Sequence, residues 1–252
     1  MRFLFSIFLS IILIGQSFAK TEPSHLVIDI NSKEIISANQ PSLQRPIASI
    51  TKLMTAVVVL ESTTSLKEYV PYKGTILKSK NVSRYDLLES LLIRSDNEAA
   101  ESLANSYPGG RTEFIDTMNQ KAKTFQMFET KFTDPSGLSA GNVSTSYDLY
   151  LLLTNAYQHT VIGNTSSSKF FKVETKKNKK ITYITVDNTN SRLLSIFDSI
   201  VLSKTGYTNP AGRCLVVIVE DNFKKYAIII LGEKNSIDRF NKAKNLIESL
   251  PK

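Results

Sequence analysis

The chain has 252 residues, 42% of them hydrophobic, and a formal net charge of +8. This length suffices for an ample core in one large domain or two intimately joined ones. A single cysteine excludes a disulfide framework, and two histidines with one cysteine argue against a zinc site. The basic charge fits an anionic polymer as partner, while the scarcity of basic clusters on the predicted helices argues against nucleic acid.

The N-terminal segment has the pattern of a cleaved secretory signal. An apolar run at 3–15 follows a basic second residue, and a Ser-Phe-Ala sequence ends at Ala19. The alternative is a membrane anchor, but the apolar run is short for a membrane span. We therefore expect a signal peptide over residues 1–19 and a mature protein over residues 20–252.

Hydrophobic periodicity outlines the rest of the chain. Alternating apolar residues predict an N-terminal hairpin, with strands at 26–30 and 34–38. Helical spacing follows at 51–63, 83–93, 98–106, 111–125 and 146–157. Strand patterns return at 170–175, 181–187, 199–204, 213–220 and 225–232. A last helix carries on its apolar face Ile237, Phe240, Ala243, Ile247 and Leu250. Strands at both ends of a helical middle predict a mixed α/β (α+β) fold, with one sheet assembled from distant segments and a helical insertion.

Three short motifs carry the functional signal, and the first is a Ser-x-x-Lys pattern at Ser49 and Lys52. The apolar run after Lys52 predicts a buried helix, on which residues three apart share a face. A serine becomes a nucleophile when a base removes its proton, and a lysine is such a base if burial or a nearby cation lowers its pKa. The alternative is a serine that caps a core helix beside a solvated lysine. Lys52 interrupts an otherwise apolar stretch, which counts against that alternative.

The second motif is Ser95-Asp96-Asn97, at the break between two predicted helices. Polar side chains in such a connection can face a cleft. Ser95 could relay a proton to a leaving group, and the Asn97 amide could bind a substrate amide and the lysine of the first motif. The alternative is a helix cap, a role that we expect Asp96 to fill in either case.

The third motif is Lys204-Thr205-Gly206, within or at the end of a predicted edge strand. A cation at this position can hold a substrate carboxylate, and Thr205 adds a hydroxyl donor. Gly206 leaves room for a peptide to pair with the strand edge. Taken alone, this motif would indicate an ordinary hairpin with a surface lysine.

In this order, and separated by 46 and 109 residues, the motifs resemble those of the low-molecular-mass penicillin-binding proteins. These are the serine D-alanyl-D-alanine peptidases of the bacterial wall. Further sequences typical of the family stand at 107–110, 134–138, 142–145, 188–190 and 204–209. The sequence given ends soon after the last predicted helix and carries Tyr-Pro-Gly-Gly, and in both respects it is most similar to the endopeptidase branch of the family. Carboxypeptidase relatives usually continue into a second, β-rich domain and a membrane-binding tail. This sequence shows no such segment, so we expect no stable membrane anchor after signal cleavage.

The resemblance implies a fold, a location and partners. The fold would be that of the β-lactamases and DD-peptidases, an antiparallel sheet flanked by helices with an all-helical insertion, in one catalytic domain over residues 20–252. The location would be the periplasm. Peptidoglycan stem peptides would be substrates and β-lactams covalent inhibitors, and no cofactor or metal is implied.

The resemblance also implies roles for individual residues. Ser49 would attack the D-alanyl carbonyl, Lys52 would accept its proton, and Ser95 would pass a proton to the leaving amine. Backbone N–H groups of Ser49 and Tyr207 would stabilise the oxyanion. The substrate-binding residues would be Asn97, Lys204, Thr205, Gly206 and Tyr207.

Three other functions share these motifs. One is a D,D-carboxypeptidase that removes terminal D-alanine, and another is a catalytically weak protein that binds the wall or senses penicillin. The third is a class A β-lactamase, which needs a glutamate in a Glu-x-x-Leu-Asn segment to activate the deacylating water. In those enzymes the glutamate lies a few tens of residues beyond the Ser-Asp-Asn motif. The carboxylates near that distance here are Glu129 and Asp134, and neither is followed by the Leu-Asn pair. We therefore expect a poor β-lactamase.

Overall fold

The structure, a computed structural model, describes residues 22–62, 64–177 and 180–251. The predicted signal peptide at residues 1–19 lies outside the described residues. Within the described part of the chain, no helix has the length and apolar character needed to cross a membrane.

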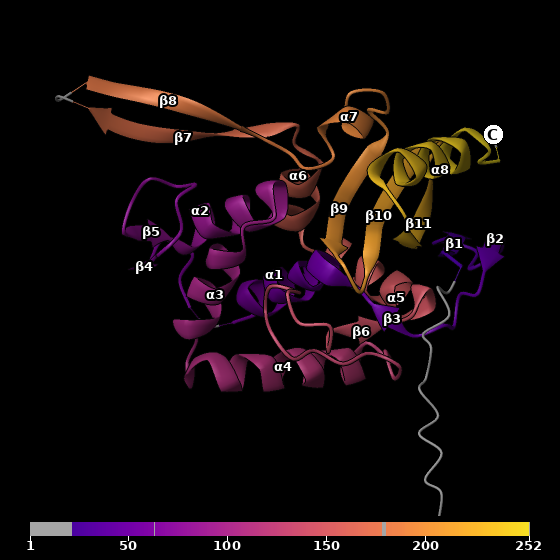
Figure 1. The fold of residues 1–252 in the computed structure, drawn as a ribbon, viewed down its shortest axis with the longest axis horizontal. Coiled ribbons are helices and arrows are strands. Elements are labelled where there is room, and N and C mark those ends of the chain that lie inside the picture. Colours follow the sequence, from indigo (N-terminus) through magenta and orange to yellow (C-terminus); the bar gives the residue numbers. More distant parts are fainter. Residues whose placement is uncertain (1–21, 63, 178–179, 252) are drawn as a thin grey trace, which may run out of the picture.

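The main sheet consists of antiparallel strands in the order β2-β1-β11-β10-β9 (Figure 1). Its strands are β1 (Ser24–Asp29), β2 (Ile35–Asn39), β9 (Ile200–Thr208), β10 (Gly212–Asp221) and β11 (Lys224–Glu233). Ser24 pairs with Leu231, so the N-terminal and C-terminal parts of the described chain meet in one sheet. The predicted hairpin and the sheet assembled from distant segments are confirmed, and β9 is an edge strand.

Both faces of the sheet are covered, because successive residues of a strand point to opposite sides. Leu26 packs in the larger core cluster, and the next residue, Val27, packs in a smaller cluster beneath α8 (Ser236–Glu248). Ile237 was predicted on the apolar face of this last helix but is 64% exposed. The buried face centres on Leu246 and its neighbours, and at ~3.6 residues per turn Ile237 falls outside it.

The helical part of the fold lies between β2 and β9, as predicted (Figure 1). Its helices are η1 (Ala48–Thr51), α1 (Lys52–Leu60), α2 (Arg84–Glu89), η2 (Ser90–Arg94), α3 (Asn97–Asn105), α4 (Gly110–Thr124), α5 (Ser146–Tyr157), α6 (Thr160–Ser167) and α7 (Ser191–Leu194). Helix α1 is buried from Lys52 to Val59, since all of its residues except Lys52 and Thr55 are apolar. Sequence periodicity did not predict α6, because its glycine and its Ser and Thr residues have low helix propensity.

Short strands pair outside the main sheet. They are β3 (Arg45–Pro46) with β6 (Val143–Ser144), β4 (Tyr69–Pro71) with β5 (Asn81–Ser83), and β7 (Phe170–Lys177) with β8 (Lys180–Asp187). The β7–β8 hairpin projects away from the body of the molecule (Figure 1). Ile181 and Tyr183 on β8 are 50% and 63% exposed, so the alternating pattern of this strand belongs to a solvent-facing hairpin and not to the main sheet.

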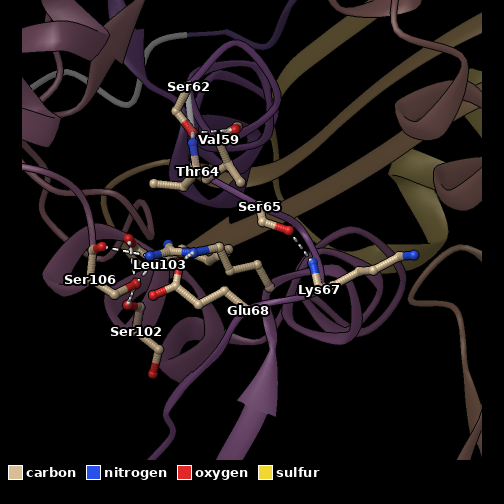
Figure 2. Close-up of polar contacts among 10 residues, drawn as sticks. Val59, Ser62, Thr64, Ser65, Lys67, Glu68, Ser102, Leu103 and Ser106 are labelled. Carbon is tan, nitrogen blue, oxygen red and sulfur yellow. Dashed lines mark hydrogen bonds and ion pairs between the residues drawn. The ribbon is translucent and has the colours of Figure 1, made fainter.

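Polar contacts fix the segment between the first two motifs to neighbouring helices (Figure 2). Ser62 Oγ donates to the carbonyl of Val59 near the end of α1 at 2.7 Å. The buried guanidinium of Arg84 binds the Glu68 carboxylate at 3.2 Å and the Ser106 carbonyl at 2.6 Å. These contacts tie the segment to the C-terminal end of α3.

Candidate active site

Ser49 lies in η1, the tight turn that leads into α1. The residue before it, Ala48, has a φ of 46°, in the left-handed region that non-glycine residues rarely adopt. Gly137 packs against this turn so closely that a Cβ would lie 2.0 Å from the Ala48 carbonyl oxygen. Thr51 Oγ1 donates to the same carbonyl at 2.8 Å. These contacts hold the partly exposed Ser49 at the start of a buried helix.

Lys52 directs its amine at Ser49. Its Nζ lies 3.0 Å from Ser49 Oγ, 2.7 Å from Asn97 Oδ1 and 2.5 Å from the carbonyl of Ser136. A neutral amine has two N–H groups and one lone pair, and carbonyl oxygens only accept hydrogen bonds. Asn97 and Ser136 therefore occupy both N–H groups, and the lone pair is left for the Ser49 hydroxyl proton.

Burial controls the charge of Lys52. The side chain is fully buried, and its removal from water lowers the pKa of Lys52 to about 7, against the opposing effect of Asp134, Asp96 and Glu101. A substantial fraction of Lys52 is therefore neutral near pH 7. Of the two causes that the sequence left open, burial or a neighbouring cation, burial is the leading one.

The Asp-Pro-Ser-Gly-Leu loop at 134–138 supports Lys52, a role that the sequence patterns did not reveal. The Asp134 carboxylate accepts N–H groups from Ser136, Gly137 and Ser139 at 2.5–2.7 Å. Burial alone would raise the pKa of Asp134, but these hydrogen bonds bring it below its ordinary value. The ionised Asp134 thus organises the loop and fixes the Ser136 carbonyl beside Lys52.

The second motif occupies the connection between η2 and α3, where the two helical patterns predicted it. Ser95 has a φ of 63° where η2, a π-helical turn, ends, and such turns are frequent at functional sites. Asp96 accepts the N–H groups of Glu98 and Ala99 and so caps α3, which confirms the predicted cap. Asn97 opens α3 with its side chain on the amine of the first motif.

The third motif lies on β9, the edge strand of the sheet. Lys204 Nζ is 2.8 Å from Ser95 Oγ and so links the sheet to the helical side. A Cβ on Gly206 would lie 3.0 Å from the backbone nitrogen of Ser49, so glycine permits the close approach of β9 to the nucleophile turn. The structure therefore brings all three sequence-predicted motifs together.

Lys204 is almost fully buried beside other cations. Burial lowers its pKa well below the ordinary value, and the positive charges of Lys52 and Arg239 lower it further. A carboxylate placed here would favour the charged form of Lys204. The surroundings of Lys204 are therefore those of an anion site.

Two residues outside the motifs extend this part of the site. Thr189 Oγ1 accepts a hydrogen bond from the Thr205 hydroxyl at 2.6 Å, and the Thr189 backbone N–H donates to the Ile93 carbonyl on η2. Arg239 lies in the first turn of α8, and its buried Nε has no hydrogen-bond partner among the residues that the structure describes. The family resemblance included 188–190 but gave Thr189 no role, and sequence reasoning missed Arg239, which lies in the polar start of an amphipathic helix.

Tyr207, the residue after Gly206, turns its side chain outward. Its ring is 47% exposed, the guanidinium of Arg213 stacks on it at 3.6 Å from the ring centroid, and its hydroxyl donates to Asn209 Oδ1 at 2.7 Å. The predicted contribution of Tyr207 to substrate binding therefore rests on its backbone, which follows Gly206 along β9.

Sequence comparison identifies the family. A profile of the D-alanyl-D-alanine carboxypeptidase family matches residues 16–76 and 67–235. The chain belongs to this family. It is a serine D-alanyl-D-alanine peptidase and is similar to the D-alanyl-D-alanine endopeptidases of Escherichia coli and Pseudomonas aeruginosa, with 39% and 36% identity. Each alignment covers 88% of this chain and 75% of the relative.

Solved structures share the fold of this peptidase. A penicillin-binding protein from Listeria monocytogenes in its ampicillin-bound form has a TM-score of 0.80 at 28% identity, covering 89% of this chain and 95% of the other. A Streptomyces DD-transpeptidase superposes with a TM-score of 0.81 at 23% identity, covering 89% and 94% of the two chains. The predicted DD-peptidase fold is confirmed.

Proposed function

We propose that this peptidase is an exported endopeptidase that hydrolyses the D-alanyl bond of peptidoglycan cross-links through an acyl-enzyme on Ser49. The observation that carries the proposal is the arrangement at Lys52, whose buried Nζ lies 3.0 Å from Ser49 Oγ. The names of the endopeptidase relatives support the choice of bond. The signal pattern over residues 1–19 supports export to the periplasm, with residues 20–252 as one catalytic domain.

Acylation begins with Ser49. Its Oγ attacks the carbonyl carbon of the D-alanyl residue while its proton passes to Lys52. The carbonyl oxygen becomes an oxyanion, for which the backbone N–H groups of Ser49 and Tyr207 are the proposed donors. The proton taken up by Lys52 leaves with the amine, relayed by the Ser95 hydroxyl, and the C–N bond breaks. Water then attacks the ester carbonyl, the bond from that carbonyl to Ser49 Oγ breaks, and Oγ takes up a proton from the water, which releases Ser49.

The leaving side of the substrate carries a carboxylate in this scheme. Lys204 and Thr205 are its proposed partners on β9, and Arg239 adds a third group whose Nε is buried without a partner in the described chain. Penicillins also carry a carboxylate beside a strained amide. The ampicillin-bound relative supports the proposal that β-lactams acylate this peptidase in the same way.

A carboxypeptidase is the second candidate, because the family carries that description. The deciding experiment incubates the purified mature protein with cross-linked muropeptide dimers and with pentapeptide monomers, and separates the products by chromatography. We expect conversion of dimer to monomer. Conversion of pentapeptide to tetrapeptide alone would indicate a carboxypeptidase, and no conversion would indicate a binding or penicillin-sensing protein. Ser49→Ala is the inactive control.

A further inference from the structure

A cavity opens beside the proposed active site, on its helical side. It has a volume of about 570 Å³ and is bordered by Ser95 and Asn97 of the second motif. Its other walls come from the segment at 73–76, from Arg94 at the end of η2 and from Glu98 in the first turn of α3. The cavity is thus continuous with the groups that face Lys52, yet none of the proposed chemical steps uses it.

The outer wall of this cavity is attached to the second motif through Tyr72. The Tyr72 hydroxyl donates to Asp96 Oδ2 at 2.6 Å and accepts the N–H of Ile76 at 3.3 Å. Gly74 lies so close to Tyr72 that a Cβ would be 2.2 Å from the hydroxyl oxygen. Burial, together with the Asp96 carboxylate, raises the pKa of Tyr72, which keeps the hydroxyl a donor. The wall and the motif therefore form one preorganised unit.

The charges around the cavity favour an anion. Lys73 and Arg94 are exposed, and neither forms an ion pair within the described residues. The Asp96 carboxylate is buried and accepts hydrogen bonds from Tyr72 and from the α3 backbone. Among the described residues that line the cavity, Glu98 is then the one exposed carboxylate, against two cations. An arginine paired with a lysine at a preformed cavity is suited to bind a carboxylate.

We propose that this cavity is a subsite for an acidic side chain on the acyl side of the substrate, with Arg94 and Lys73 as its specificity-determining residues. The inference rests on the proposed function. Lys204, on the sheet side, holds the carboxylate of the leaving side in that scheme. The acyl part of the substrate therefore extends past Asn97, which borders the cavity. The preferred substrate carries a carboxylate one residue before the D-alanyl group.

A competition experiment tests the subsite without requiring turnover. The purified protein is labelled at Ser49 with fluorescent penicillin while synthetic peptides compete, each ending in D-alanyl-D-alanine and preceded by either glutamate or glutamine. These two residues have the same shape and differ in charge. We expect the glutamate peptide to compete about tenfold more strongly at low salt, as a charge-assisted contact does at a partly exposed site. Added salt reduces the difference.

Variants identify the residues. Arg94→Gln and Lys73→Gln should each reduce the preference for glutamate to about twofold or less, whereas Glu98→Gln should increase it. Lys80→Gln is the matched control, an exposed lysine outside the cavity, and should leave the preference unchanged. Normal labelling with equal competition by both peptides, or a preference that survives in Arg94→Gln and Lys73→Gln, overturns the subsite and leaves the proposed function intact. Absence of labelling at Ser49 overturns the proposed function itself.

Discussion

The cations around the cleft fall into two groups, and burial separates them. Lys52 and Lys204 are 0% and 1% exposed, and both have lowered pKa values. Lys73 and Arg94 are exposed to water at the surface of the neighbouring cavity. The same residue type can therefore be a proton acceptor inside the site and an anion anchor at its rim. Substitutions at the buried lysines, and at the tyrosine that supports the exposed pair, therefore test this difference.

The largest effect should follow from Lys52→Ala. This variant removes the group whose lone pair faces the Ser49 hydroxyl, and general-base catalysis contributes about 10²–10⁴-fold to rate. We expect acylation by penicillin to slow by roughly 10³-fold. Stopped-flow or gel-based labelling measures the rate, and thermal unfolding confirms that the fold survives. If a folded variant acylates at the normal rate, Lys52 is not the base.

A smaller effect should follow from Lys204→Gln. Loss of a cation opposite the substrate carboxylate should lower kcat/KM by roughly 10–100-fold, the range for hydrogen bonds to charged groups. The neighbouring Arg239 and Thr205 remain to bind the carboxylate. Steady-state kinetics with a D-alanyl peptide measures the loss. A variant with unchanged KM and kcat would remove Lys204 from substrate recognition.

The pH profile sharpens the comparison between the two buried lysines. In the wild type, protonation of Lys52 removes the base, so kcat, the rate at which bound substrate reacts, should fall as the pH drops through about 7. Bound carboxylate favours charged Lys204, and that cation in turn favours neutral Lys52. The acidic limb of kcat should therefore move to higher pH in Lys204→Gln. An unmoved limb with weaker binding would confine Lys204 to recognition.

The smallest effect should follow from Tyr72→Phe. This variant loosens the contact between the cavity wall, which carries Lys73, and the second motif of the active site. The variant removes the hydroxyl donor to Asp96, and one such bond contributes about 1 kcal/mol to stability. Asp96 retains the Ser90 hydroxyl and its capping contacts, so the fold should survive. We expect a modest loss in urea unfolding and a reduced preference for acidic peptides. Wild-type values in both assays would show that the wall is positioned by other contacts.

Much of this arrangement follows from sequence, because its components are local. Periodicity located the strands of the sheet, and the motifs located Ser49 and Ser95 near the ends of helices and Lys204 on the edge strand. What stayed hidden depends on tertiary contacts between distant segments. The Ser136 carbonyl is a backbone group 84 positions from Lys52, and its role requires the close approach of Gly137 to Ala48.

The same reason explains the other omissions. Arg239 stands in no motif, and the family sequence at 188–190 does not by itself show that Thr189 meets Thr205 and η2. The wall of the cavity at Arg94 is attached to the second motif through Tyr72, and no periodicity in the sequence predicts that contact. Sequence patterns thus predict which elements carry the chemistry, whereas the packing of loops determines burial and, through burial, pKa.

The most direct test of the central claim is the identity and lifetime of the penicillin adduct. Purified protein is treated with penicillin, digested and analysed by mass spectrometry over time. We predict one penicilloyl ester, on Ser49, that persists well beyond one normal peptide turnover. Persistence is expected because the Asp134 carboxylate is committed to loop N–H groups and is not available to activate water. An adduct on another residue, no adduct, or rapid multi-turnover hydrolysis of penicillin would contradict the account.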